Sequence, residues 1–332
     1  MSVLSAINPT LMDVTKRLNP NGGIETDIVE ILTAVNPILE DMPWKEGNLP
    51  TGHRSTIRTG LPDVTWRKLY GGVQPSKSRT AQVTDTCAML EAYAEIDKAL
   101  ADLNGNTAAF RISEEKAFLE AFSQEFASKL FYGNEATTPE HFTGFAARYS
   151  SKSAENAENI LSSASTPDNS DNTSIWLIGW GDNVHGIYPK GSRAGLSMTD
   201  KGQVTIENAD GNGGRMEGYR THYRWDCGLV VRDWRYCVRI QIDQEDLVKN
   251  AATGPDLIDL LAQATELLPS LANCRPVFYA NRNVRSFLRR QIVNKVAAST
   301  LTADSVGGKQ VLAFDGIPFR RTDALLNTET GF

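Results

Sequence analysis

Cysteine is scarce in this 332-residue chain, and its four copies stand far apart. They include no Cys-x-x-Cys pair, so they predict neither a zinc site nor a disulfide framework. Widely spaced single cysteines are typical of free core thiols and of a reducing compartment such as a bacterial cytoplasm. The four are Cys87, Cys227, Cys237 and Cys274.

Long apolar runs and a secretion leader are also missing. No run approaches the ~20 residues that a membrane-spanning helix needs. The start, Met1-Ser2-Val3-Leu4-Ser5, has no basic stretch followed by an apolar one, which disfavours a signal peptide. We therefore expect a chain that is soluble where it is made and has no membrane partner.

Motifs for catalysis and metal binding are absent as well. The sequence contains no His-Glu-x-x-His, no Gly-x-Ser-x-Gly and no Walker-type loop. The segment 210–214 has the composition of a nucleotide or calcium loop, but it lacks the following helix and the closing Glu. We expect a surface turn there, and a protein without catalytic residues, metal or cofactor. The isolated histidines are His53, His141, His185 and His222.

The chain also has no surplus of basic residues. It contains 34 Lys and Arg against 40 Asp and Glu, which gives a net charge of −6. A protein whose main task is to coat phosphate backbones needs the opposite balance. The remaining composition, with 41% hydrophobic and 22% charged residues, is that of an ordinary globular protein. The length suits one large or two modest domains.

Proline interrupts the first 44 residues repeatedly. Asn8-Pro9, Asn19-Pro20, Asn36-Pro37 and Met42-Pro43 break the pattern, because a proline pushes the preceding residue out of the helical region. Apolar residues between the breaks predict one short amphipathic helix at residues 25–35. Such a segment cannot form a core alone, so residues 1–44 are predicted to be an arm that lies on another surface.

Residues 45–85 have the pattern of an extended β-hairpin. His53–Thr59 and Val64–Tyr70 are rich in strand formers, and a third run, Thr80–Leu90, returns the chain. Positions 45–79 carry seven basic residues against two acidic ones. A charged hairpin with few large apolar groups has little reason to fold back on its own chain, so we expect it to project and meet a partner. Its candidate contact residues are Arg54, Arg58, Arg67, Lys68, Lys77 and Arg79.

A long helix is predicted at residues 113–132. Ser113 suits the N-cap, Phe118, Phe122 and Phe126 recur at i+4, and Gly133 is predicted to end the helix in a left-handed conformation. Positions 91–125 carry eight acidic residues against three basic ones, so the basic hairpin of one copy is a candidate to lie over this region of the next. Two ordinary solvated faces are the alternative. The acidic candidates are Glu114, Glu115 and Glu120.

The second half of the chain is β-rich. Buried or paired strands are predicted at 175–178, 204–207, 215–224 and 276–279. A longer strand is predicted at 228–242, with a bulge near Trp234, and a hairpin at 311–321 around Asp315-Gly316. Asp256 opens one helix, and Asn281 caps another that extends to residue 295. No acidic residue lies between Asn273 and Ala303. The arginines predicted to face packaged DNA or an adjacent subunit are Arg282, Arg285, Arg289 and Arg290, with a solvated helix face as the alternative.

This order of segments resembles the major capsid protein of tailed bacteriophages, the Hong Kong 97-like fold, and most closely a short-tailed-phage branch. The likeness covers nearly the whole chain, and its specificity comes from order and spacing. The stretches that carry it are 101–106, 130–134, 176–181, 186–191 and 276–282.

The resemblance implies an α+β fold with an N-terminal arm at 1–44 and an extended loop at 45–85. It also implies a peripheral domain at 86–172 with a spine helix at 113–132. Residues 173–332 would form a β-rich axial domain plus returning peripheral-domain strands. Such chains assemble as hexamers and pentamers into an icosahedral shell in the virion, built in the host cytoplasm around double-stranded DNA.

The expected partners also follow from the resemblance. The arm is too short to be a cleavable scaffolding region, so a separate scaffolding protein is implied, together with a portal and a possible cement or decoration protein. A mildly acidic wall does not adhere to the DNA that it encloses, so contact with DNA is expected to be non-specific. The alternatives are a DNA-associated binding protein that uses helix 281–295 and an enzyme of unknown class.

Overall fold

The computed structural model describes residues 36–102, 107–163, 171–207, 213–247, 255–294, 301–306 and 309–331. The predicted helix at 25–35 and most of the predicted arm lie outside these residues. The chain divides into two compact units. Among the described residues, the helix unit contains Met89–Phe126 and Gly195–Asp226. The sheet unit contains Val35–Ala88, Ala127–Ala194 and Cys227–Phe332.

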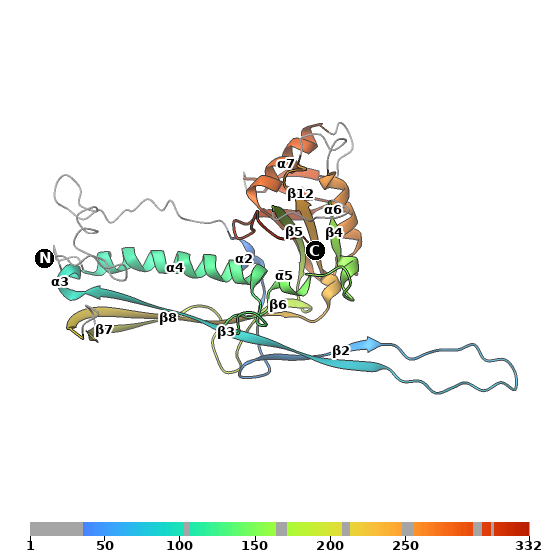
Figure 1. Ribbon diagram of the computed structural model, residues 1–332, viewed down its shortest axis with the longest axis horizontal. Coiled ribbons are helices and arrows are strands. Elements are labelled where there is room, and N and C mark those ends of the chain that lie inside the picture. Colours follow the sequence, from blue (N-terminus) through green and yellow to red (C-terminus); the bar gives the residue numbers. More distant parts are fainter. Residues whose placement is uncertain are drawn as a thin grey trace. The chain divides into compact units, whose positions relative to one another are not determined.

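In the helix unit, a long helix lies along a ribbon of antiparallel strands (Figure 1). The predicted phenylalanine stripe faces this ribbon. The rings of Phe118 and Phe122 lie 5.6 and 6.1 Å from the ring of Tyr223, and Phe126 stacks on Trp225 at 4.6 Å. The elements are β3 (Arg79–Asp97), α3 (Lys98–Ala101), α4 (Thr107–Tyr132), β7 (Ser197–Glu207) and β8 (Arg215–Val231), of which β3, α4 and β8 continue into the sheet unit.

Helix α4 begins earlier than its sequence predicts. It starts at Thr107, so the predicted cap Ser113 lies inside the helix and that prediction is wrong. The cause is tertiary packing, because Phe110 is buried against Ile96 and Ala101 and thereby stabilises the additional turns.

The predicted end of α4 is confirmed, but the predicted role of Gly133 is wrong. The helix ends at Tyr132, and the backbone of Gly133 is not left-handed. A Cβ at this position would lie 2.5 Å from the carbonyl oxygen of Phe142 and 2.6 Å from that of Lys129. Glycine is required here because backbone segments approach closely, and not because of its φ angle.

The sheet unit is built on a seven-stranded sheet with the order β11-β12-β13-β10-β5-β9-β4. Apolar side chains from its strands and from two helices form one core, which includes Leu177, Phe278, Leu261 and Leu288. The strands are β4 (Ile160–Ser162), β5 (Asn172–Trp180), β9 (Cys237–Asp243), β10 (Arg275–Ala280), β11 (Leu301–Val306), β12 (Lys309–Phe314) and β13 (Ile317–Arg321). The helices are α6 (Leu257–Glu266) and α7 (Arg282–Asn294).

Local signals in this part of the sequence are largely confirmed. The Asp256 carboxylate accepts hydrogen bonds from the first-turn amides of α6, and the Asn281 side chain accepts one from the Val284 amide at 2.9 Å. Asp315 and Gly316 have φ angles of 50° and 77°, as a tight turn between β12 and β13 requires. These caps and turns depend on neighbouring residues alone, which explains why sequence reasoning finds them.

The strand predicted at 228–242, with a bulge near Trp234, is divided into two strands at that position. β8 ends at Val231 and β9 begins at Cys237, with a 3-10 turn at Trp234–Tyr236 between them. The Asp233 carboxylate accepts a hydrogen bond from the Arg235 amide at 3.1 Å and so stabilises the turn.

A hairpin and short elements complete the sheet unit. β2 pairs antiparallel with β3 from Gly52↔Thr86 outward, and β1 pairs parallel with β6. The predicted strand at Val64–Tyr70 is wrong, since residues 61–78 form neither helix nor strand and none of the described strands pairs with them. The elements are α2 (Ile38–Asp41), β1 (Trp44–Glu46), β2 (Gly52–Gly60), α5 (Phe145–Arg148), a 3-10 turn at Ala157–Asn159 and β6 (Val184–Tyr188).

Candidate interaction surfaces

The tip of the β2–β3 hairpin, residues 61–78, is an exposed apolar surface. Figure 1 shows it at the far end of the hairpin, away from the strands of the seven-stranded sheet. Trp66 and Tyr70 are fully exposed, with relative accessibilities of 104% and 105%. The expectation of few large apolar groups in the hairpin is therefore wrong. The exposed apolar residues of the tip are Leu61, Val64, Trp66, Leu69, Tyr70 and Val73.

The basic candidates of the hairpin are also exposed. Arg54 donates a hydrogen bond from Nε to Thr84 Oγ1 at 3.2 Å, which fixes its side chain along the stem. Within the described part of the chain, no ion pair involves any of the six candidates, which are Arg54, Arg58, Arg67, Lys68, Lys77 and Arg79. With respect to the described residues, the hairpin thus carries positive charge without ion-pair partners beside exposed apolar groups.

The acidic candidates lie on α4 and are half-buried. Glu115 accepts a hydrogen bond from Thr221 Oγ1 at 3.1 Å, and Glu120 accepts one from Gln124 at 2.7 Å, while Glu114 also has an interaction partner. These carboxylates therefore already have contacts inside their own chain. Pairing between Glu114, Glu115 or Glu120 and the hairpin of another copy stays a prediction.

The four arginine candidates of α7 do not act as one set. Arg282 forms a bidentate ion pair with Asp323, with nitrogen–oxygen distances of 2.6 and 2.7 Å. Arg290 lies over the Phe287 ring at 4.7 Å and donates to Ser286. Arg285 is half-buried and Arg289 is exposed.

The root of the arm is fixed by a buried polar group that sequence reasoning missed. Asp41 accepts a hydrogen bond from the Tyr279 hydroxyl at 2.6 Å and pairs with Arg320 at 2.9 Å. Trp180 donates to the same hydroxyl at 2.9 Å. Burial and the nearby Asp41 raise the pKa of Tyr279, so this hydroxyl stays a donor. Residues 36–46 are therefore fastened to β10 and β13.

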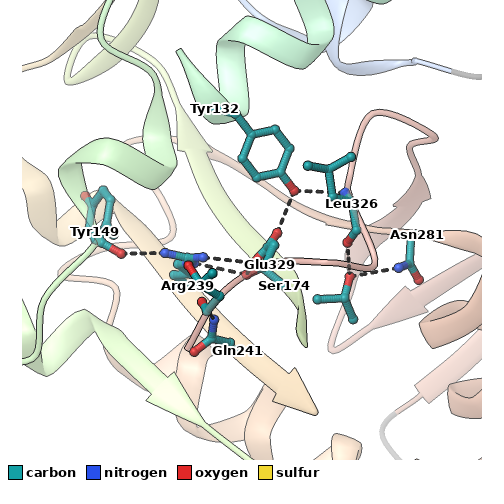
Figure 2. Close-up of polar contacts among 10 residues, drawn as sticks. Tyr132, Tyr149, Ser174, Arg239, Gln241, Asn281, Leu326 and Glu329 are labelled. Atoms are coloured by element: carbon teal, nitrogen blue, oxygen red, sulfur yellow. Dashed lines mark hydrogen bonds and ion pairs between the residues drawn. The ribbon is translucent and has the colours of Figure 1, made fainter. Parts of the chain in front are cut away.

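A second buried network, here called the C-terminal clasp, consists of Tyr132, Ser174, Arg239 and Glu329 (Figure 2). Arg239 and Glu329 form an ion pair at 2.8 Å, and both are buried. The Tyr132 hydroxyl donates to Glu329 at 2.5 Å, and Ser174 donates to the other carboxylate oxygen. Arg239 also donates to the Tyr149 carbonyl at 2.7 Å. The clasp joins the last residues of the chain to β5, β9 and the end of α4.

The only sequence signal for the clasp is an arginine inside a fully buried strand. Arg239 stands between Val238 and Ile240 in β9, and every residue of that strand is buried. A buried guanidinium requires a buried acceptor, because an unpaired charge in a core is very costly. The sequence gives no indication that this acceptor is Glu329, 90 residues away.

The root of the hairpin contains two histidines in an enclosed setting. The rings of His53 on β2 and His185 on β6 lie 6.2 Å apart, and His185 Nδ1 has no hydrogen-bond partner among the described residues. Burial first, then Lys45 and His53, lowers the pKa of His185 to about 4. Nearby, Asp85 on β3 pairs with Arg148 at 2.7 Å. Neutral histidines and one partly buried ion pair thus hold the root together.

In the described segments, no group of three or more His, Cys, Asp or Glu side chains is arranged to hold a metal ion. None of the described helices is long and apolar enough to cross a membrane. The exposed apolar tip at residues 61–78 is a surface suited to contact with another macromolecule.

Comparisons with known proteins agree with that conclusion. Residues 19–332 match the family model "Major capsid protein GP7". A chain from the structure of bacteriophage Epsilon15 is 34% identical, with 99% of both chains covered and a TM-score of 0.79. No curated protein matches.

More distant similarities are found in other shells. A chain of the bacteriophage JBD30 capsid is 8% identical, with 89% of this chain and 92% of that chain covered and a TM-score of 0.46. A capsid chain of a native GTA particle is 9% identical, with 65% and 95% covered and a TM-score of 0.44. The alternative of a DNA-associated binding protein that uses helix 281–295 is not supported by the matches.

The exposed hairpin, the spine-like helix α4 and the β-rich second half now have a common explanation. The family match spans nearly the whole chain, and the Epsilon15 chain shares both its length and its fold. The chain belongs to the Major capsid protein GP7 family, with the predicted Hong Kong 97-like α+β fold and a structural role in a phage capsid.

Proposed function

We propose that this chain forms a phage head by assembling with copies of itself into hexamers and pentamers of an icosahedral shell. The observation that carries the proposal is the exposed apolar tip at residues 61–78. Burying one aromatic or aliphatic side chain stabilises a protein by roughly 1.5–3 kcal/mol. A tip that exposes several of them, without intramolecular partners among the described residues, is suited to burial against another subunit.

The charges of the hairpin support a second copy as that partner. Among the described residues, Arg58, Arg67 and Lys68 of the hairpin have no ion-pair partner, whereas the region around α4 is acidic. Complementary potentials of this kind guide encounter and fix register between subunits. In this proposal the tip supplies the buried area and the basic side chains select its position on the neighbour.

The two compact units receive different roles in the proposal. The helix unit acts as the peripheral domain around α4, and the sheet unit, which carries α6 and α7, contains the axial domain. The arm predicted at residues 1–44 contacts a neighbouring subunit in this proposal, which is supported only by its described root, where Asp41 is bonded to Tyr279. The short-tailed-phage branch is part of the same proposal.

The remaining partners are proposed on the family resemblance. They are a separate scaffolding protein, a portal and a cement or decoration protein, with packaged double-stranded DNA touched non-specifically. Assembly takes place in the host cytoplasm, and the protein catalyses no reaction. The net charge of −6 is consistent with a wall that does not adhere to DNA.

Electron microscopy and sedimentation of the overexpressed chain test the proposal, with and without a co-expressed scaffold. The wild-type chain is expected to form shells or capsomers. The double variant Trp66→Ser with Tyr70→Ser is expected to remain folded but to lose shells, because these exposed side chains do not stabilise the chain's own core.

A matched control separates assembly from general surface hydrophobicity. Met198→Ser removes an exposed apolar side chain, 58% accessible, from β7. This variant is expected to form shells normally. Wild-type protein that stays monomeric at every concentration, or tip variants that assemble as well as wild type, would contradict the proposal.

A further inference from the structure

Guanidinium groups cluster on α7 and β13, and those of Arg285 and Arg289 have no ion pair with any of the described residues. Arg285 and Arg289 are one helical turn apart, and Arg321 lies near enough to act electrostatically on Arg285. The Nε atoms of Arg285 and Arg321 are buried and have no hydrogen-bond partner among the described residues. Arg321 forms only a long ion pair with Asp323, at 3.8 Å, and that carboxylate is already bound by Arg282 at 2.6 Å. We call Arg285, Arg289 and Arg321 the arginine trio.

The trio is unfavourable while it stands alone. Leaving a buried donor without an acceptor is unfavourable, and the three like charges also repel one another. Burial, Arg289 and Arg321 together lower the pKa of Arg285 from its ordinary value. A bound anion removes both costs, so the trio is suited to receive one.

Carboxylates already neutralise the arginines around the trio. Arg282 is paired with Asp323 at 2.6 Å, and Arg320 is paired with Asp41 at 2.9 Å. These carboxylates interrupt the basic residues and repel a long polyanion such as DNA. The geometry therefore favours one or two carboxylate groups over a phosphate backbone.

The sheet unit also carries a surface of opposite charge, which lies on α6. On α6, the exposed stripe is Asp259, Gln263 and Glu266, and the helix contains no basic residue. On α7 there are four arginines and no acid. No ion pair joins the two helices in the described part of the chain. The contact at the start of α6 is instead a hydrogen bond, which the Gln291 side chain accepts from the Leu257 amide at 3.2 Å.

An open groove lies beside the acidic stripe. It has a volume of about 600 Å³, an apolar floor that includes Leu161, Leu267 and Phe314, and the acids Glu266 and Asp315 in its lining. An arginine presents an apolar stem and a charged end, and so matches such a groove. Figure 1 shows α6 and α7 as separate helices of the sheet unit, α7 toward its upper end and α6 along its right side.

Rings of identical subunits are built from contacts in which two different surfaces of the same chain meet. The structure assigns such a pair: we propose that the arginine trio of one copy binds the Asp259 and Glu266 carboxylates on α6 of the adjacent copy in the same capsomer. This inference rests on the proposed shell function. It adds the residues that form the contact between adjacent subunits of the ring.

A charge swap tests the pair in the full-length chain, with shell yield measured by sedimentation and electron microscopy. Arg289→Glu and Glu266→Arg are each expected to reduce the yield by about tenfold or more, because like charges then face each other. The combined variant, Arg289→Glu with Glu266→Arg, is expected to recover most of the wild-type yield. Rescue requires that the two positions meet, since both side chains are exposed in the isolated chain.

A second double variant controls for net charge. Arg289→Glu with Glu140→Arg has the same total charge as the rescuing pair, but Glu140 is an exposed residue outside α6. It is expected to remain deficient. Equal rescue by both double variants would overturn the inference, as would normal shells from both single variants.

The outcomes also separate this inference from the function on which it rests. If wild-type protein forms shells and the Arg289–Glu266 swap fails to restore them, only the pairing is wrong. If Arg289→Glu leaves shell yield intact and reduces the packaged DNA, the trio contacts phosphate and the pairing is overturned. If wild-type protein forms neither shells nor capsomers, the proposed function itself is lost.

Discussion

At the scale of single residues, the clasp places a charge where a core residue is expected. Arg239 and Glu329 are buried and 2.8 Å apart, and each has additional hydrogen-bond partners. An ion pair of this kind adds little over apolar packing, but removing one member leaves an uncompensated buried charge. The end of the chain therefore depends on both residues together.

Glu329→Gln is expected to destabilise the protein by about 3–5 kcal/mol, because Arg239 loses its counter-charge while the shape is kept. Chemical denaturation followed by fluorescence measures the change. The matched control is Glu207→Gln, since Glu207 pairs with Arg215 on the surface, where both are about 70% exposed. That variant is expected to change stability by less than about 1 kcal/mol, and equal losses would refute the argument.

His185 is expected to make the hairpin root sensitive to acid. Its pKa is about 4 in the folded chain and 6.5 when exposed, so the unfolded chain binds the proton more readily between these values. Stability is therefore complete above about pH 6.5 and falls as the pH drops toward 4, by on the order of 3 kcal/mol. Unfolding midpoints of wild type and His185→Asn between pH 4 and 7 measure it. A slope unchanged in His185→Asn would show that another group is responsible.

At the scale of elements, sequence reasoning succeeds where the signal is local. The phenylalanine stripe of α4, the Asn281 cap and the Asp315-Gly316 turn each depend on a few neighbouring residues. It fails where distant packing decides. Phe110 lengthens α4 through contacts with Ile96, and the apparent strand at 64–70 has no neighbour with which to pair.

The same distinction applies to the candidate surfaces. The basic residues of the hairpin are visible as an excess of charge, whereas the exposure of Trp66 and Tyr70 is visible only in three dimensions. The clasp joins residues that are 90 positions apart, and no pattern in one sequence links them. The four arginines of α7 can be identified from the sequence. Only the structure shows that Arg282 is paired with Asp323 and that Arg285 Nε has no hydrogen-bond partner among the described residues.

Gly133 tests the close approach at the end of α4. In Gly133→Ala, the added methyl would lie about 2.5 Å from the Phe142 carbonyl oxygen, so the segment after the helix must shift. The expected cost is about 1–3 kcal/mol, as for other overpacked sites. Thermal unfolding measures it, with Gly72→Ala as a control, because nothing lies within 4 Å of a Cβ at that glycine. A tolerated Gly133→Ala would contradict the role given to this residue.

At the scale of the whole molecule, the opposed charges of the hairpin and of the α4 region predict salt-dependent assembly. The Debye length falls from about 10 Å at 0.1 M salt to about 3 Å at 1 M, which screens attraction between subunits before they touch. Light scattering is expected to show slower shell formation at high salt, and less salt dependence for Arg58→Gln with Lys68→Gln. A rate that does not change with salt would leave apolar contact as the sole driving force.

The apolar tip also has a consequence for the newly made subunit. Before a partner subunit binds, the side chains of Trp66 and Tyr70 are exposed to water, as apolar side chains are in a misfolded protein. Shell assembly and non-specific aggregation therefore compete for the same apolar surface. The outcome depends on how quickly the subunit binds its correct neighbours. A cell that synthesises this chain faster than the chain is incorporated into growing shells is expected to accumulate insoluble protein.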